Sequence, residues 1–182
     1  MTILLAGLNH RTAPVALREK LALAGTDLHE ALGALHDACS SHEEDRPSSL
    51  KEGALLSTCN RFECYVVVDD VVAGRAHLEQ YLAGLRKMPI EQLEPHLYFR
   101  MDVDAVQHLF RVASGLDSMI VGEPQILGQV KHAFGAAQGA DATGPVLSHL
   151  LSQAIHAGKR ARSETGISRH TTSVSHAGVA MI

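Results

Sequence analysis

The sequence predicts an α+β fold: a ferredoxin-like antiparallel sheet of order βαββαβ with helices on one face, followed by a helical subdomain. Apolar, β-branched runs of strand length alternate with helical periodicities up to Met101. After Met101 only helical periodicities follow. With 46% hydrophobic and 20% charged residues among 182, the chain can also bury a substantial core.

The first strand is expected over residues 3–8, where an apolar run is stopped by turn residues. Pro14 at the N1 position predicts a short helix that ends before Gly25. A second helix is expected over residues 26–40, because apolar side chains recur at three- and four-residue steps. These side chains are Leu28, Ala31, Leu32, Leu35 and Cys39. The polar, proline-containing stretch 41–51 is expected to be a loop.

Two strands joined by a tight turn are expected over residues 54–58 and 62–68, which are apolar and β-branched. Apolar residues with helical spacing predict a helix over 72–85. A last strand is expected over 97–101. These elements complete the βαββαβ core, which is expected to span residues 1–101 and to be the catalytic part.

Three helices are expected in the helical subdomain, residues 102–170. Asp102 or Asp104 can cap the first, which should run to about Ser114. Pro124 at N1 opens the second, to about residue 138, and Pro145 the third, to about residue 164.

Composition excludes several function classes. The net charge of −4 and the 4% aromatic content argue against a generally basic nucleic-acid binder with stacking side chains. No apolar run approaches the roughly 18 residues of a membrane span, and no signal peptide precedes the first strand, so a cytoplasmic protein is expected. Residues 131–182 hold five Lys or Arg against two acids, so positive charge is local to this end.

Three cysteines, Cys39, Cys59 and Cys64, are an odd number without metal-type spacing, which argues against a disulfide framework. Cys59 lies in the expected tight turn beside Arg61, and a neighbouring cation favours the reactive thiolate. The alternative is that Cys59 is a small buried hydrophobic residue. Cys64, inside the second strand, fits that alternative better.

No metal site is expected, despite 12 histidines. His149 and His156 are two helical turns apart, about 10 Å, which is too far to share an ion. His36, Cys39 and His42 are spaced by threes, but they extend from a helix end into a loop.

Three motifs together resemble glutamyl-tRNA reductase. They are GLNHRTAP at 7–14, LSTCNRFE at 56–63 and ASGLDSMIVGEPQILGQV at 113–130, and the resemblance extends to about Ser175. That family reduces the activated glutamate of glutamyl-tRNA with NADPH to glutamate-1-semialdehyde, the first step of tetrapyrrole (haem) biosynthesis by the five-carbon route. The resemblance implies an oxidoreductase that works as a homodimer, with possible transfer of its product to glutamate-1-semialdehyde aminomutase.

The resemblance also assigns residues. It implies that Cys59 is the nucleophile that forms a thioester with glutamate. Arg61 is the expected bidentate partner of the substrate's side-chain carboxylate. The implied substrate contacts are Thr58, Asn60, Arg61, Ser118, Glu123, Pro124, Gln125 and Gln129. Phe62 and Cys64 depart from the family pattern, which more often has Thr and an aliphatic residue there.

His108 corresponds to a histidine that is important for activity in the family. The apolar stripe of its expected helix, which includes Val103 and Val106, places His108 on roughly the opposite side, as for an exposed histidine. With the resemblance, we expect His108 to orient substrate or to handle protons at the leaving 3′-oxygen.

The sequence carries no G-x-G-x-x-G fingerprint, and no strand follows the helices to open a dinucleotide-binding unit. The cofactor NADPH is therefore expected on a domain that this chain does not contain. Residues 171–182, a capping cluster with an apolar continuation, are expected to begin the linker to that domain.

Two other classes remain open. RNA-recognition modules share the βαββαβ order, and Phe62 and Tyr65 would then stack on bases, although the K/R-G-F/Y motif is missing. The third hypothesis is an interaction domain that docks a partner protein, or the tRNA backbone, through Lys159, Arg160 and Arg162.

Overall fold

A computed structural model describes residues 1–40, 42–43, 46–47 and 49–167, with side chains for 1–40 and 49–167. The strands are β1 (Thr2–Asn9), β2 (His42–Glu43), β3 (Arg46–Pro47), β4 (Leu50–Ser57), β5 (Arg61–Val68) and β6 (Tyr98–Met101). The helices are α1 (Val15–Leu21), α2 (Gly25–Ser40), α3 (Val71–Leu85), α4 (Ile90–Leu93), the 3-10 helix η1 (Glu94–His96), α5 (Asp102–Ala113), α6 (Gln125–Gly139) and α7 (Pro145–Glu164).

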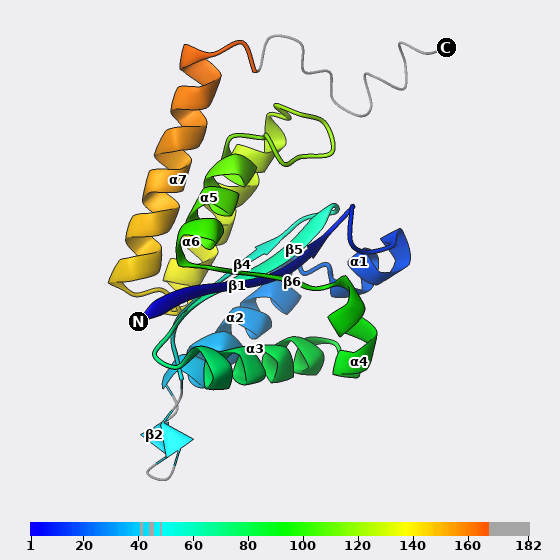
Figure 1. The fold of residues 1–182 in the computed structure, drawn as a ribbon, viewed down its shortest axis with the longest axis vertical. Coiled ribbons are helices and arrows are strands. Elements are labelled where there is room, and N and C mark those ends of the chain that lie inside the picture. Colours follow the sequence, from blue (N-terminus) through cyan, green and yellow to red (C-terminus); the bar gives the residue numbers. More distant parts are fainter. Residues whose placement is uncertain (41, 44–45, 48, 168–182) are drawn as a thin grey trace.

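The main sheet has the strand order β4-β5-β1-β6, and every neighbouring pair is antiparallel (Figure 1). With the crossovers through α2 and α3, this is the predicted ferredoxin-like topology. In the β1–β5 register Gly7 lies opposite Glu63 and Asn9 lies opposite Arg61. The end of β1 therefore lies next to the turn that precedes β5.

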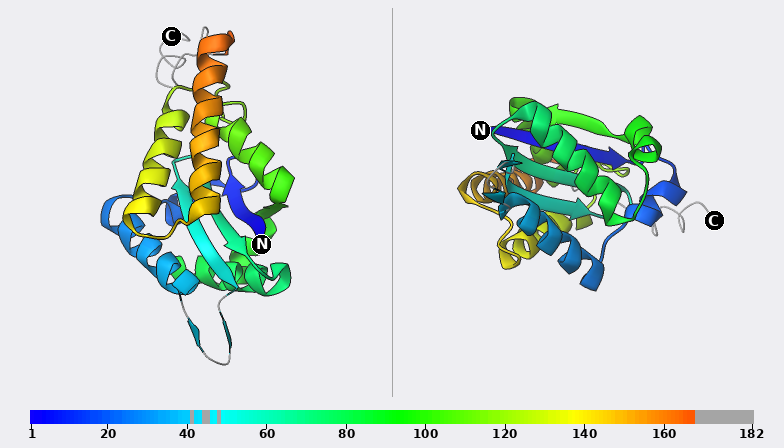
Figure 2. Two further views of the ribbon diagram at one scale, coloured as in Figure 1. Left: turned by 90° about the vertical axis from the view of Figure 1, so that its left-hand side faces the viewer. Right: turned by 90° about the horizontal axis from the view of Figure 1, so that it is seen from below.

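Helices cover both faces of this sheet. α2 and α3 pack on one face, and α5, α6 and α7 pack on the other (Figures 1 and 2). As a result all eight residues of β5 are buried, the charged Arg61 and Glu63 as well as the apolar and β-branched residues that make up the rest of the strand. The prediction of helices on one face holds for the ferredoxin-like part, whereas the covering of the second face by the helical subdomain was not predicted.

The hydrophobic core is continuous across the sheet. Its buried residues come from the strands, from α2 and α3, and equally from α5, α6 and α7. The expected apolar face of α2 is confirmed, since all five of its predicted side chains are buried. The division into residues 1–101 and 102–170 stays a prediction.

Several boundaries differ from the sequence prediction. The expected loop 41–51 is wrong in part, because it contains the β2–β3 hairpin and because β4 already begins at Leu50. Leu50 is buried and pairs with β5 across a bulge, which extends the strand beyond its apolar run. Pro14 and Pro124 stand at the N-cap, one position before N1.

α2 starts at Gly25, which has a φ of +54°, rather than at a capping side chain. α4 and η1 were not predicted. The expected linker 171–182 lies outside the described residues. Among the helices that the structure describes, none is long and apolar enough to cross a membrane.

Candidate active site

Cys59 lies at the tip of the turn between β4 and β5 and is exposed. The hydroxyl of Thr58 accepts hydrogen bonds from the N–H groups of Asn60 and Arg61, both at 3.1 Å. The Thr58 N–H donates to the Arg61 carbonyl at 2.9 Å. Within this turn, as far as the described residues show, the N–H of Cys59 is the one backbone donor without a partner.

Two residues near the N-terminus form hydrogen bonds to this turn. Arg18, on α1, donates from Nη1 to the Cys59 carbonyl at 2.9 Å and to Oδ1 of Asn60 at 2.8 Å. The His10 N–H donates to the Asn60 carbonyl at 2.9 Å. His10 of the 7–14 motif and Arg18 of α1 therefore position the turn that carries the thiol. The sequence did not reveal this role, because the partners are more than 40 residues away along the chain.

A shallow recess lies beside the thiol, and its empty space of about 280 Å³ includes open solvent. It is lined by Thr58, Cys59, Asn60, Arg61, Ser118, Met119, Glu123, Ile126 and Gln129. Seven of these are predicted site residues, and Met119 and Ile126 are additions. Pro124 and Gln125 do not line the recess: both are exposed at the start of α6, and Gln125 lines a neighbouring groove.

The loop between α5 and α6 brings Ser118 to this recess. Gly115 and Gly122 both have positive φ, of +78° and +81°, and the Gly122 N–H donates to the Gly115 carbonyl at 2.9 Å. A Cβ on Gly115 would lie 3.0 Å from the Cα of Gly122, so the two glycines allow the loop to close on itself. This closure places Asp117 and Ser118, both buried, against the thiol-bearing turn.

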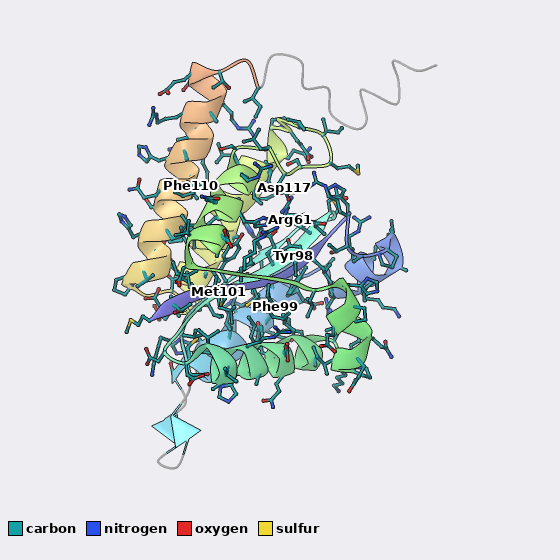
Figure 3. All side chains as sticks on the ribbon, in the orientation of Figure 1. Arg61, Tyr98, Phe99, Met101, Phe110 and Asp117 are labelled. Carbon is teal, nitrogen blue, oxygen red and sulfur yellow. The ribbon has the colours of Figure 1, made fainter. Side chains whose placement is uncertain are left out.

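Arg61 lies between Asp117 and Tyr98 (Figure 3) and is 2% exposed. Its Nη1 donates to Oε1 of Glu63 at 2.6 Å. Its Nη2 donates to Oδ2 of Asp117 at 3.0 Å and to the Asp117 carbonyl at 2.7 Å. Arg11 pairs with the other oxygen of Asp117 at 3.1 Å.

Glu63 is fully buried and accepts four hydrogen bonds. Besides Arg61, the donors to Oε1 are the Tyr98 hydroxyl at 2.6 Å and Nε2 of His108 at 2.7 Å. The Tyr65 hydroxyl donates to Oε2 at 2.7 Å. We call Arg61, Glu63, Tyr65, Tyr98, His108 and Asp117 the buried polar cluster.

The cluster sets the ionisation of its members. Burial by itself would raise the pKa of Glu63, but the charge of Arg61 and the hydrogen bonds from His108 and Tyr98 hold it well below its ordinary value. Burial, with the neighbouring Glu63 carboxylate, raises the pKa of Tyr98 above its ordinary value. Glu63 is therefore a carboxylate and Tyr98 a neutral phenol at neutral pH.

Two observations bear on the expectations about this region. Both terminal nitrogens of Arg61 bind protein carboxylates, although Arg61 also lines the recess, so its pairing with the substrate's carboxylate stays a prediction. His108 is buried, 6% exposed, and points to Glu63, whereas Val103 on the expected apolar stripe is 67% exposed. The helix turns its Ala105, His108 and Leu109 side to the protein, because a hydrogen-bonded histidine can be buried as well as an apolar residue.

The sequence model of the family described as glutamyl-tRNAGlu reductase, N-terminal domain, matches residues 6–165. The chain belongs to the glutamyl-tRNA reductase family. It is similar to the glutamyl-tRNA reductase of Syntrophotalea carbinolica, with 45% identity over 98% of this chain and 38% of that protein. The Shouchella clausii protein of the same name is 47% identical over 95% of this chain and 36% of its own length.

A solved structure, glutamyl-tRNA reductase from Methanopyrus kandleri, superposes with a TM-score of 0.74 at 32% identity. The match covers 98% of this chain and 39% of that one. The chain thus spans somewhat more than a third of the length of its relatives and corresponds to the N-terminal domain of this family.

Within this member of the glutamyl-tRNA reductase family, the three thiols differ sharply in environment. Burial raises the pKa of Cys39 to about 12, and it raises the pKa of Cys64 well above its ordinary value. Cys59 alone of the three is exposed. The buried-residue alternative for Cys59 is therefore excluded, and Cys64 is buried as expected.

The described residues contain no group of three or more His, Cys, Asp or Glu side chains that could hold a metal ion. Nδ1 of His36 bonds to the Asp141 carbonyl at 2.8 Å, and Cys39 is buried. The side chain of His42 lies outside the described residues.

An RNA-recognition surface is not present on this sheet. Phe62 and Tyr65 are 2% and 1% exposed, and helices cover both faces, so neither ring can stack on a base. Of the basic residues on α7, Arg160 pairs with Glu164 and Arg162 donates to the Glu123 carbonyl at 2.6 Å. Arg162 therefore ties α7 to the loop that borders the recess.

Proposed function

We propose that this domain takes the glutamyl group from glutamyl-tRNA onto Cys59 as a thioester. The observation that carries the proposal is an exposed thiol on a turn whose backbone is fixed, at the mouth of a recess formed by the residues of the family's motifs. Thr58, Asn60, Ser118, Glu123 and Gln129 are the proposed contacts of the glutamyl group.

In this reaction the Cys59 thiolate attacks the ester carbonyl carbon, and a sulfur–carbon bond replaces the bond to the ribose 3′-oxygen. The 3′-oxygen leaves as a hydroxyl and takes up the proton that the Cys59 thiol released when it became a thiolate. The Cys59 N–H points to no protein acceptor among the described residues, so it can donate to the oxyanion that forms during attack. The thioester carbonyl then accepts a nucleophile or a hydride more readily than the ester did.

We assign the buried polar cluster a positioning role. Arg61 follows the turn directly and is held between Glu63 and Asp117, so the cluster fixes where β5 begins. His108 acts through Glu63 and does not line the recess, which replaces its expected role at the leaving oxygen.

The residues described here do not fit NADPH. Their main sheet is antiparallel, and the sequence has no G-x-G-x-x-G that opens a βαβ unit. We propose that NADPH is held outside this chain and that the thioester is there reduced to glutamate-1-semialdehyde. Homodimer formation and transfer to the aminomutase belong to the same proposal and rest on the family resemblance. A cytoplasmic location is part of the proposal as well.

The proposal is tested by following glutamate release from charged glutamyl-tRNA in the absence of NADPH. Wild-type protein should deacylate the tRNA, because water can hydrolyse the thioester. Cys59→Ser should lose this activity, while the matched variant Cys39→Ala, at a buried thiol on α2, should keep it. Equal rates for wild type and Cys59→Ser would refute the proposal.

A further inference from the structure

The oxygen atoms of Cys59 and Asn60 are all occupied by donors from outside the turn. Nη1 of Arg18 donates to the Cys59 carbonyl at 2.9 Å and to Oδ1 of Asn60 at 2.8 Å. The His10 N–H donates to the Asn60 carbonyl at 2.9 Å. Both backbone carbonyls and the side-chain carbonyl of these two residues therefore already accept a hydrogen bond.

The nitrogen groups that remain without a partner are donors. The Asn60 N–H is used, since it donates to the hydroxyl of Thr58 at 3.1 Å. The Cys59 N–H and Nδ2 of Asn60 are left, and the described part of the chain offers neither of them an acceptor. Nδ2 is also reachable from solvent. Beside the thiol, Cys59 and Asn60 thus present two free donors and no free oxygen.

Arg18 determines which end of the Asn60 amide is free. A guanidinium carries donors only, so the end of the amide that it binds is the oxygen. Asn60 lines the recess, whereas Arg18 does not. With Oδ1 held by Arg18, Asn60 offers a donor, and not an acceptor, to a molecule in the recess.

Two fixed donors beside a nucleophile suit one step of acyl transfer. When the Cys59 thiolate attacks an ester, the carbonyl oxygen becomes an oxyanion. N–H donors that are held in place beforehand lower the barrier of this step, because they need no reorganisation as the charge develops. The Cα atoms of neighbouring residues are about 3.8 Å apart, so the Cys59 N–H and the Asn60 amide lie at the same end of the recess as the sulfur.

The substrate has a second negative group, the side-chain carboxylate of its glutamyl moiety. This carboxylate lies at the far end of the glutamyl chain from the carbon that the thiol attacks. The Cys59 N–H belongs to the attacking residue itself and Nδ2 of Asn60 to the next one. Their position therefore favours the ester oxygen over the carboxylate.

We propose that the Cys59 N–H and Nδ2 of Asn60 together bind the oxyanion that forms when Cys59 is acylated, with Arg18 as the positioning residue that holds the Asn60 amide. The proposal rests on the proposed acyl transfer to Cys59 and deepens it. Asn60 acts on the reacting oxygen, and α1 contributes to the chemistry through Arg18 although it lies outside the recess.

The test compares two reactions of the same thiol. Acetylation by p-nitrophenyl acetate passes through an oxyanion, whereas alkylation by iodoacetamide displaces iodide at a saturated carbon and forms none. Both rates depend equally on the amount of thiolate, so their ratio reports the oxyanion site alone. Cys59→Ala supplies the background of both reactions.

Asn60→Ala should lower the ratio of acetylation to alkylation about 100-fold, as for the loss of one oxyanion donor. Asn60→Asp should lower it at least as far, because a carboxylate keeps the contact with Arg18 but has no N–H to donate. If Asn60 only stabilised the turn, Asn60→Asp would keep the ratio of wild type. An unchanged ratio in either variant would overturn the proposal, as would a wild-type protein that p-nitrophenyl acetate does not acetylate at Cys59.

Arg18→Met should lower the ratio about tenfold, less than the loss of the donor itself. Arg18→Lys should lower it less, since lysine can still donate to Oδ1 of Asn60. Lys20→Met is the matched control and should leave the ratio unchanged, because Lys20 is exposed on the same helix and forms no hydrogen bond to the turn within the described residues.

The double variant tests whether Arg18 acts through the Asn60 amide. If it does, adding Arg18→Met to Asn60→Ala should lower the ratio no further, because the amide that Arg18 positions is already absent. A further tenfold decrease in the double variant would show that Arg18 acts by another route and would overturn its assignment as the positioning residue.

Glutamyl-tRNA separates the oxyanion site from the acyl transfer on which it rests. With saturating glutamyl-tRNA, single-turnover acylation of Asn60→Ala should also be about 100-fold slower than that of wild type. If Asn60→Ala instead raises only KM for glutamyl-tRNA and keeps the acetylation ratio, Asn60 binds the glutamyl carboxylate and the proposal is wrong. If the acetylation ratio falls as predicted but wild type takes no glutamyl group from the tRNA, the oxyanion site stands and the acyl transfer from tRNA is refuted.

Discussion

The thiol-bearing turn and the buried polar cluster are adjacent in sequence but differ in almost every physical respect. Cys59 is exposed and its N–H has no partner in the described chain, while Arg61, two residues later, is 2% exposed and bound on both terminal nitrogens. Glu63, two further on, is fully buried. Within five residues the chain passes from a reactive surface to a saturated network of charges.

This contrast indicates that the turn serves the chemistry and that the cluster serves stability. The turn leaves its reactive groups unpaired, which suits chemistry but contributes little stability. The cluster satisfies every charge it buries and joins β5, β6, α5 and the 114–124 loop through Glu63 and its partner Arg61. Changes in the cluster should therefore affect stability, and changes in the turn should affect activity without affecting stability.

The largest loss of stability is expected for Glu63→Gln. The amide keeps the shape but removes the charge that Arg61 and His108 face in a fully buried site. Breaking one partner of a buried ion pair should lower the free energy of unfolding by about 3 kcal/mol. Urea denaturation measures this loss, and a decrease below about 1 kcal/mol would show that the cluster is not the anchor described.

A somewhat smaller loss of stability is expected for Gly7→Ala. A Cβ on Gly7 would lie 2.8 Å from Cγ of Glu63 and 3.0 Å from a ring carbon of Tyr98. This overpacking should cost about 2 kcal/mol. The control Gly33→Ala, at an α2 position with nothing within 4 Å, should instead stabilise by about 0.5–1 kcal/mol. Equal urea midpoints for the two variants would contradict the packing argument.

The smallest loss of stability is expected for Tyr98→Phe, which removes one hydrogen bond to the Glu63 carboxylate. This change should lower the free energy of unfolding by about 1.5 kcal/mol at pH 7. Burial and Glu63 raise the pKa of Tyr98, so its contribution is fully present below the ordinary value of 10 and decreases as pH rises above it. Urea midpoints at pH 7 and pH 11 should thus differ less in Tyr98→Phe than in wild type. An unchanged alkaline decrease would exclude Tyr98 as its source.

The sequence was sufficient to predict the main sheet, because each of its four strands contains an apolar run and the apolar residues of α2 and α3 recur with helical spacing. It also singled out Cys59, and the predicted turn position of this residue is confirmed, while its role as nucleophile stays a prediction. It could not predict that α5, α6 and α7 would cover the second face of the sheet. That arrangement depends on packing between elements far apart in the chain.

The buried polar cluster was missed for a different reason. Sequence patterns assign charged residues to the surface, so Glu63 was not singled out, Arg61 was expected to be available to substrate, and His108 was placed opposite the apolar stripe. A carboxylate with four donors can be fully buried, but here the donors come from three different elements, β5, β6 and α5. Such a network cannot be predicted from the alternation of apolar and polar residues along the chain.

The central claim is that the exposed thiol of Cys59, and no other group, accepts the glutamyl moiety. Intact-mass measurement after brief reaction with charged glutamyl-tRNA, followed by peptide mapping, tests it directly. We predict a single glutamyl adduct on the peptide that contains Cys59, and none in Cys59→Ser, whose urea midpoint should match that of wild type. An adduct on another residue, or its persistence in Cys59→Ser, would contradict the account.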